Sequence, residues 1–213
     1  YISGNKFRKL KYNLEQAQFL KHTTLLTFGG AFSNHIAAVA AAGKEFGFKT
    51  IGVIRGDELG SEIQNNPTLA FAQSCRMQFE FVSREAYREK ESPQLISSLE
   101  QKWGDFYLIP EGGTNELAVR GAEEILTSDD ASYDYVCSAV GTGGTISGLI
   151  RSAFSHQKIL GFPALKGDFL QAEICKFAAV GHWELIQEYD FGGYAKVTHE
   201  LIEFINDFYQ KNQ

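Results

Sequence analysis

The chain has 213 residues, 44% hydrophobic and 22% charged, so it can bury a sizeable core as one large domain or two small ones. Its net charge of −6 argues against nucleic-acid binding, which needs a basic surface, and no apolar run is long enough to span a membrane. Cys75, Cys137 and Cys175 lie far apart in apolar segments, which predicts reduced, buried thiols and a cytoplasmic protein. Neither they nor the histidines have the spacing of a metal site.

Short β-branched or aromatic runs alternate with helical periods along the chain. The first helix follows Lys6, with Phe7, Leu10, Leu14 and Ala17 on one side. The elements expected next are a strand at 24–28, a helix at 36–46, strand 50–54, helix 68–76, strand 79–82, helix 93–103, strand 106–109, a helix from 116 to about 126, strand 133–140, helix 146–154, strand 159–163 and helix 201–212. Repeated strand–helix units predict parallel sheets with helices on their faces.

Three polar or glycine-rich loops follow predicted strands, at residues 29–35, 111–115 and 141–145. Ligands of open α/β sheets bind beyond the carboxyl ends of the strands. We therefore expect the chemistry of this protein in these loops.

The loop Gly141-Thr142-Gly143-Gly144-Thr145 leads from an apolar strand into a helix. Glycines let several backbone N–H groups converge on an anion at a helix N-terminus, and the two threonines add hydroxyl donors. This pattern is typical of a phosphate site, although an ordinary tight turn would also explain it. It is neither a Walker loop nor a dinucleotide fingerprint.

Two shorter motifs carry candidate chemistry in the first part of the chain. In Ser3-Gly4-Asn5-Lys6 a turn precedes a lysine, the residue that forms Schiff bases, but Arg8, Lys9 and Lys11 are rivals for that role. Ser33-Asn34-His35 offers polar groups at a helix start, suited either to a carboxylate or to plain helix capping.

Together these motifs resemble the family that contains 1-aminocyclopropane-1-carboxylate deaminase and D-cysteine desulfhydrase. The segment Gly4-Asn5-Lys6-Phe7-Arg8-Lys9-Leu10 is similar to the family's lysine segment, and the other two motifs follow in the family's order and spacing. The resemblance implies a tryptophan-synthase-β-like α/β fold with two open, mainly parallel sheets, and pyridoxal 5'-phosphate as cofactor. It also implies a cytoplasmic homodimer that acts on a small amino acid.

The resemblance also implies a role for each matching residue. Lys6 would bind the cofactor aldehyde and shuttle protons, Asn34 would bind the ring hydroxyl, and Gly141, Thr142, Gly143, Gly144 and Thr145 would hold the phosphate. Ser33, Asn34 and His35 would bind the substrate carboxylate, with Ser33 also catalytic. Tyr194 falls where the family has an active-site tyrosine, although a packed aromatic would explain it equally well. Thr114 and Asn115 would line the mouth of the site.

The same resemblance implies the domain organisation. Residues 1–20 and 126–213 would form an incomplete cofactor domain, and residues 21–125 a smaller α/β domain. We expect both ends of the family's chain to be missing, because it begins before the lysine segment and continues to a second tyrosine and a partner for the pyridine nitrogen.

The implied activity is that of a deaminating lyase or hydrolase. His35 favours D-cysteine as substrate, since desulfhydrases of the family tend to have Ser-Asn-His and deaminases Ser-Asn-Gln. The alternatives are 1-aminocyclopropane-1-carboxylate deaminase, a non-catalytic cofactor-binding or regulatory protein, and a protein that uses residues 141–145 for a nucleotide phosphate.

Overall fold

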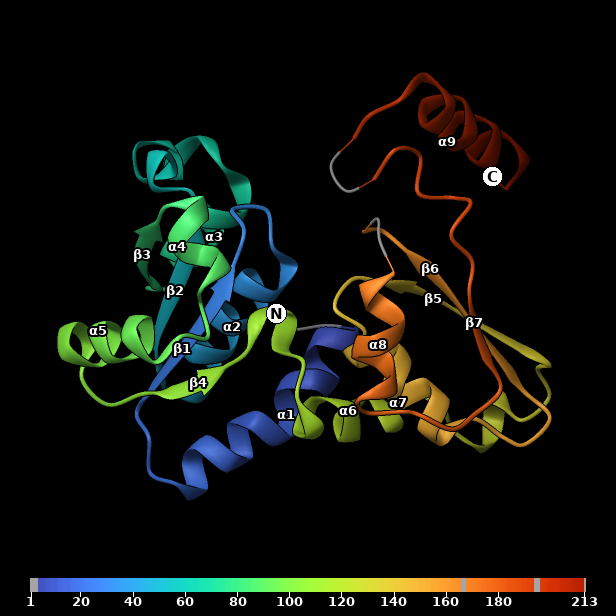
Figure 1. Cartoon of the computed structure of the whole chain (residues 1–213), viewed down its shortest axis with the longest axis horizontal. Helices are drawn as coiled ribbons and strands as arrows, with labels where there is room; N and C mark the ends of the chain where they lie inside the picture. The colour runs from blue at the N-terminus through green and yellow to red at the C-terminus, as the bar shows by residue number, and fades with distance from the viewer. Residues whose placement is uncertain (1–3, 166–167, 194–195, 213) are drawn as a thin grey trace. The chain divides into compact units, whose positions relative to one another are not determined.

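The computed structural model describes residues 4–165, 168–193 and 196–212, and the chain divides into two compact units, residues 1–125 and 126–213 (Figure 1). Each unit contains a parallel sheet with helices, so the predicted α/β class is confirmed. The assignment of residues 21–125 to a smaller domain and of residues 126–213 to a cofactor domain stays a prediction. Residues 1–20 lie in the first unit, and their assignment to a cofactor domain stays a prediction.

The first unit is built on a parallel sheet with the strand order β3-β2-β1-β4. Its strands are β1 (Thr24–Gly29), β2 (Lys49–Arg55), β3 (Gln78–Val82) and β4 (Tyr107–Ile109). Its helices are α1 (Gly4–Phe19), α2 (Asn34–Phe46), α3 (Pro67–Ser74), α4 (Arg84–Arg88), α5 (Pro93–Trp103) and α6 (Glu116–Glu123), with 3-10 turns at η1 (Asp57–Asn65) and η2 (Glu111–Gly113). Among the described helices, none is long and apolar enough to cross a membrane.

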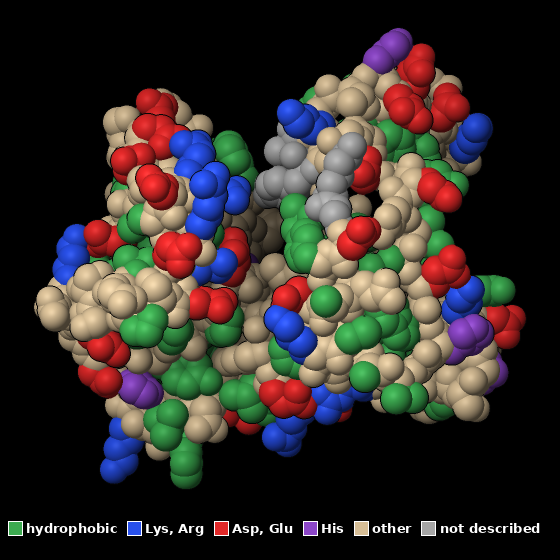
Figure 2. Space-filling model, viewed as in Figure 1, with side chains coloured by type: hydrophobic (Ala, Val, Ile, Leu, Met, Phe, Trp, Pro, Cys, Tyr) green, Lys and Arg blue, Asp and Glu red, His purple; other side chains and the backbone are tan. Residues whose placement is uncertain are grey.

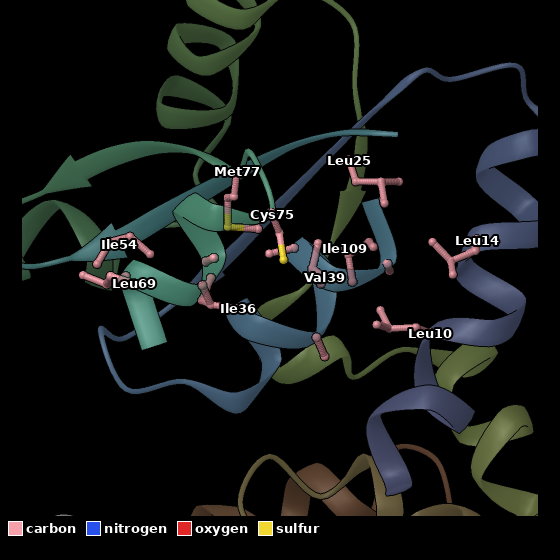
Figure 3. Close-up of a cluster of buried hydrophobic side chains, with 14 of the residues drawn as sticks. Leu10, Leu14, Leu25, Ile36, Val39, Ile54, Leu69, Cys75, Met77 and Ile109 are labelled. Carbon is pink, nitrogen blue, oxygen red and sulfur yellow. The ribbon is translucent and has the colours of Figure 1, made fainter. Parts of the chain in front are cut away.

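Both faces of this sheet are covered by helices. Successive residues of a strand point to opposite sides, so neighbouring residues of β1 pack in different clusters. On one side Leu25 packs with Leu10 and Leu14 of α1 and with residues of α2 and α3, in the cluster drawn in Figure 3. On the other side Leu26 and Phe28 pack with residues of α4 and α5. All six residues of β1 are therefore buried, as expected for a central strand of a covered parallel sheet.

Helices α1 and α6 cross at a glycine. A Cβ atom added to Gly121 would lie 1.9 Å from the backbone oxygen of Arg8, so only glycine allows this approach. Around the crossing, Glu124 binds Arg8 (3.1 Å) and Lys11 (2.7 Å) and accepts a hydrogen bond from Tyr12. The beginning of the chain is thereby fixed to the end of the first unit.

The second unit has a parallel sheet with the order β5-β6-β7. Its elements are η3 (Ser128–Asp130), β5 (Tyr135–Val140), α7 (Gly144–Ser152), β6 (Lys158–Pro163), α8 (Phe169–Cys175), β7 (Trp183–Leu185) and α9 (His199–Lys211). Sequence analysis missed α8 and β7, which are too short for hydrophobic periodicity to reveal. Lys and Arg lie among Asp and Glu on the visible face of each unit (Figure 2).

The prediction of three buried thiols is correct only for Cys75. Cys75 lies in the core of the first unit, whereas Cys137 and Cys175 are exposed. Cys137 lies between two half-buried residues on β5, and Cys175 ends α8. All three are free cysteines.

Candidate active site

The carboxyl ends of two neighbouring strands bring two of the predicted loops to one edge of the first unit's sheet. Strand β1 pairs in parallel with β4, with Thr27 opposite Ile109. The chain therefore leaves β1 towards Ser33 and α2 at the same edge at which β4 leads into Glu111–Gly113. These loops stand where ligands of α/β sheets bind.

Lys6 lies in the first turn of α1, and its side chain is only partly buried. Burial lowers the pKa of its amine below the usual value of 10.5. Within the described part of the chain, Lys6 makes no hydrogen bond or ion pair. An amine that is not held by a carboxylate and loses its proton more readily is suited to attack an aldehyde.

The rival lysines have different surroundings. Lys11 pairs with Glu124, and this hydrogen bond raises the pKa of Lys11. Lys9 is 1% exposed, and its Nζ donates to the Gly112 carbonyl (2.6 Å) and to Thr114 Oγ1 (2.9 Å). Burial, with the neighbouring charge of Lys6, lowers the pKa of Lys9 to about 7. These contacts support Lys6 as the available amine.

Ser33 and Asn34 begin α2 in different ways. The Ser33 hydroxyl accepts hydrogen bonds from the backbone N–H groups of His35 (3.2 Å) and Ile36 (3.4 Å), so it caps the helix. Asn34 is exposed, and its side chain has no hydrogen-bond partner among the residues described. Asn34 is thus free to bind a ligand, whereas Ser33 already has a structural role.

His35 points inward from the same loop. Its ring is 2% exposed, and Nε2 lies 2.8 Å from Thr27 Oγ1. Because Thr27 donates its own proton to the Ile109 carbonyl, Nε2 of His35 is the donor. Burial, with the charges of Lys9 and Lys6, holds the pKa of His35 well below 6.5. The ring is therefore neutral and lies behind the loop, away from the surface that a substrate could reach.

Gly113 makes room for this buried ring. It adopts a left-handed conformation (φ +68°), and a Cβ atom there would lie 2.8 Å from Cε1 of His35. Nδ1 of His35, on the same side of the ring, has no hydrogen-bond partner in the described structure. The turn after β4 and the start of α2 are consequently packed directly against each other.

The predicted phosphate loop lies in the second unit, between β5 and α7. Gly143 is left-handed (φ +84°), and a Cβ atom there would lie 3.2 Å from Cγ1 of Ile174. The helix begins at Gly144, two residues earlier than predicted, and no side chain caps it. A helix start with backbone N–H groups and no side-chain cap fits a phosphate.

Two further residues were predicted to lie at the site, Tyr194 and Asn115. Tyr194 lies outside the described residues. Asn115 caps α6 and exchanges hydrogen bonds with Asn13, so it has a structural role. Sequence analysis missed the buried position of Lys9. A signal was available, because Lys9 and Asn13 extend the buried stripe of α1 at helical spacing.

Comparison with known proteins identifies relatives of the whole chain. It is 28% identical to a Pyrococcus furiosus protein provisionally named 1-aminocyclopropane-1-carboxylate deaminase, over 96% of this chain and 68% of that one. It is also 28% identical to the Arabidopsis thaliana mitochondrial bifunctional D-cysteine desulfhydrase/1-aminocyclopropane-1-carboxylate deaminase, over 96% of this chain and 57% of that one. No family model matches the chain.

Solved structures agree with these relatives. A crystal structure of a 1-aminocyclopropane-1-carboxylate deaminase homologue matches with a TM-score of 0.78 and 25% identity, over 97% of this chain and 68% of that one. A pyridoxal 5'-phosphate-dependent aspartate racemase shares the fold, with a TM-score of 0.59 and 18% identity over 82% of this chain and 51% of that one.

The fold and these neighbours define the class, and the protein is an enzyme of the pyridoxal-phosphate-dependent lyases and deaminases. Within that class, the chain is similar to proteins named 1-aminocyclopropane-1-carboxylate deaminase and D-cysteine desulfhydrase, the family that its motifs resemble. The expectation of a hydrolase is wrong, since this is a family of lyases.

Proposed function

We propose that the protein is a pyridoxal-phosphate-dependent deaminating lyase that converts D-cysteine and water into pyruvate, sulfide and ammonia. The observation that supports this most is the state of Lys6, whose amine has a lowered pKa and no ion pair among the described residues. The second candidate is conversion of 1-aminocyclopropane-1-carboxylate and water into 2-oxobutanoate and ammonia, because both activities appear in the name of the Arabidopsis relative.

The cofactor would be held by residues whose surroundings suit its groups. Lys6 would bind the aldehyde carbon, Asn34 the ring hydroxyl, and the backbone of residues 141–145 the phosphate. When bound, pyridoxal phosphate supplies a ring that withdraws electrons from the α-carbon of an amino acid. A free Lys6 amine would accept the α-proton of D-cysteine.

His35 is the reason to favour D-cysteine, but its buried ring acts at a distance from any substrate. The neutral imidazole fills the space between Thr27 and Gly113 behind the start of α2. A residue of another shape there would move the Ser33–Asn34 turn. We therefore propose that His35 influences substrate choice through the shape of this loop.

Product formation tests the proposal. The full-length protein, loaded with pyridoxal phosphate, should form sulfide and pyruvate from D-cysteine with a higher kcat/KM than it forms 2-oxobutanoate from 1-aminocyclopropane-1-carboxylate. The reverse order would establish the deaminase instead. Cofactor bound at Lys6 without turnover of either substrate would favour the non-catalytic cofactor-binding protein.

A further inference from the structure

We propose that Lys9 is a positioning residue, which sets the place of Lys6 by fixing helix α1 to the turn after β4. This inference rests on the proposed function, because Lys6 needs a defined place only if it binds the cofactor. Lys9 is buried, and its amine is held by two oxygens of the same unit, so it would act through Lys6.

The contacts of Lys9 join two segments that are far apart in the sequence. Its Nζ reaches the Gly112 carbonyl at 2.6 Å and Thr114 Oγ1 at 2.9 Å, so the two acceptors lie on either side of Gly113. Lys6 and Lys9 are three residues apart and share one face of α1. A shift of the helix along its axis would break both bonds and move Lys6 by the same amount.

A second set of buried hydrogen bonds continues this anchor. Asn13, which is 0% exposed, donates to the Lys9 carbonyl (2.9 Å) and exchanges hydrogen bonds with Asn115. Tyr107 of β4 donates to Asn13 Oδ1 (3.2 Å). Helix α1 is thus bonded to the start of β4, to the turn after β4 and to the cap of α6.

Burying a lysine costs free energy, because an amine in the interior loses its hydration. A methionine or leucine would pack at lower cost but could not select the two oxygens of the turn. Directional bonds fix one register of the helix, which apolar contacts do less well. The chemistry of the side chain therefore points to positioning.

The anchor also reaches the loop that carries Asn34. Gly113, between the two acceptors of Lys9, packs on the ring of His35, which directly follows Asn34. Lys9 therefore relates the position of Lys6 to that of Asn34 within the same unit. These are the two residues of this unit that the proposed function assigns to the cofactor.

The test is borohydride trapping of pyridoxal phosphate on the full-length protein, with peptide mapping to quantify the adduct at Lys6. The variants are Lys9→Met, Thr114→Val and Thr114→Ser. Lys11→Met is the matched control, because it removes a lysine of the same helix that pairs with Glu124 at the α1–α6 crossing. Thermal melting of each variant shows whether it is folded.

We expect Lys9→Met and Thr114→Val to raise the cofactor concentration needed for half-maximal trapping by about tenfold, the effect of losing a buried hydrogen bond. Thr114→Ser, which keeps the hydroxyl, should restore trapping, and Lys11→Met should not change it. A structural role alone would lower the melting temperature without this pattern.

The outcomes separate the two proposals. If the unmodified protein does not form an adduct at Lys6, the proposed function fails. If the unmodified protein does so and folded Lys9→Met and Thr114→Val variants form it equally well, the positioning role of Lys9 is overturned. If Lys9→Met does not fold, the comparison of Thr114→Val with Thr114→Ser still decides.

Discussion

At the scale of single residues, the proposed chemistry of the first unit involves three basic side chains whose pKa values are lowered by burial. Lys6, Lys9 and His35 all have lowered pKa values, and the charges of the two lysines oppose protonation of His35. Clusters of shifted pKa values occur often at functional sites. Here they lie beside the loops in which sequence analysis placed the chemistry.

The buried amine of Lys9 makes stability depend on pH. Its pKa is about 7 in the folded protein and 10.5 by reference, so between these values the unfolded chain binds a proton that the folded protein lacks. The free energy of unfolding, relative to Lys9→Met, should therefore rise by on the order of a few kcal/mol from pH 7 to pH 10. Denaturant unfolding at several pH values measures it.

Lys11→Met provides the contrast for this measurement. The pKa of Lys11 is raised by Glu124, so its contribution to stability is present at neutral pH and is lost as pH rises through the folded pKa. From pH 7 to pH 10 the Lys11→Met difference should therefore stay nearly constant, while the Lys9→Met difference rises. A Lys9→Met difference that stays flat across this range would mean that Lys9 is charged in the folded protein.

At the scale of elements, helices and strands meet at points where only one residue type fits. Gly121 lets α6 approach the backbone of Arg8. Gly143, the residue just before α7, adopts a left-handed backbone conformation that glycine allows. Gly143 is itself a candidate cofactor-binding residue, and Gly121 contacts Arg8, which lies two residues after Lys6. Packing and function should therefore change together when either glycine is replaced.

Gly121→Ala tests the crossing of α1 and α6. The added methyl group meets the Arg8 carbonyl at 1.9 Å, which is backbone and must move. Overpacking of this kind typically costs about 1–3 kcal/mol. We expect a lower melting temperature and, because α1 carries Lys6, weaker trapping of pyridoxal phosphate. A wild-type melting temperature together with wild-type trapping would show that the close approach of α1 and α6 affects neither stability nor cofactor binding.

Gly143→Asp tests the phosphate loop, with Gly143→Ala as its control. Both variants place a Cβ atom in a left-handed position, but only aspartate brings a negative charge to the anion site. Cofactor affinity, measured by fluorescence titration, should be at least about tenfold lower for aspartate than for alanine, since like charges repel. Equal affinities of the two variants would show that this loop does not bind the phosphate.

At the scale of the whole molecule, the sequence was sufficient to predict the class of fold and most of the larger elements. These follow from hydrophobic periodicity, glycine turns and capping residues such as Ser33. Exposure was harder to predict. Lys9 is buried although lysine is usually exposed, and Cys137 is exposed within an apolar run, because tertiary packing decides both.

The candidate site was predictable only as a set of motifs. The sequence could not show that the ring of His35 turns inward, because Thr27 and Gly113, which receive it, are distant along the chain. Nor could it separate Lys6 from Lys9 and Lys11, whose partners belong to residues 112–124. Roles that depend on contacts between distant segments need the structure.

The proposed chemistry depends first on which lysine binds the cofactor. Borohydride reduction of the full-length protein with pyridoxal phosphate, followed by peptide mapping, tests it directly, and Lys6→Ala serves as the control. We expect a pyridoxyl group on Lys6 and none on the Lys6→Ala variant. An adduct on Lys9 or Lys11 in the unmodified protein, or the same labelling after Lys6→Ala, would contradict it.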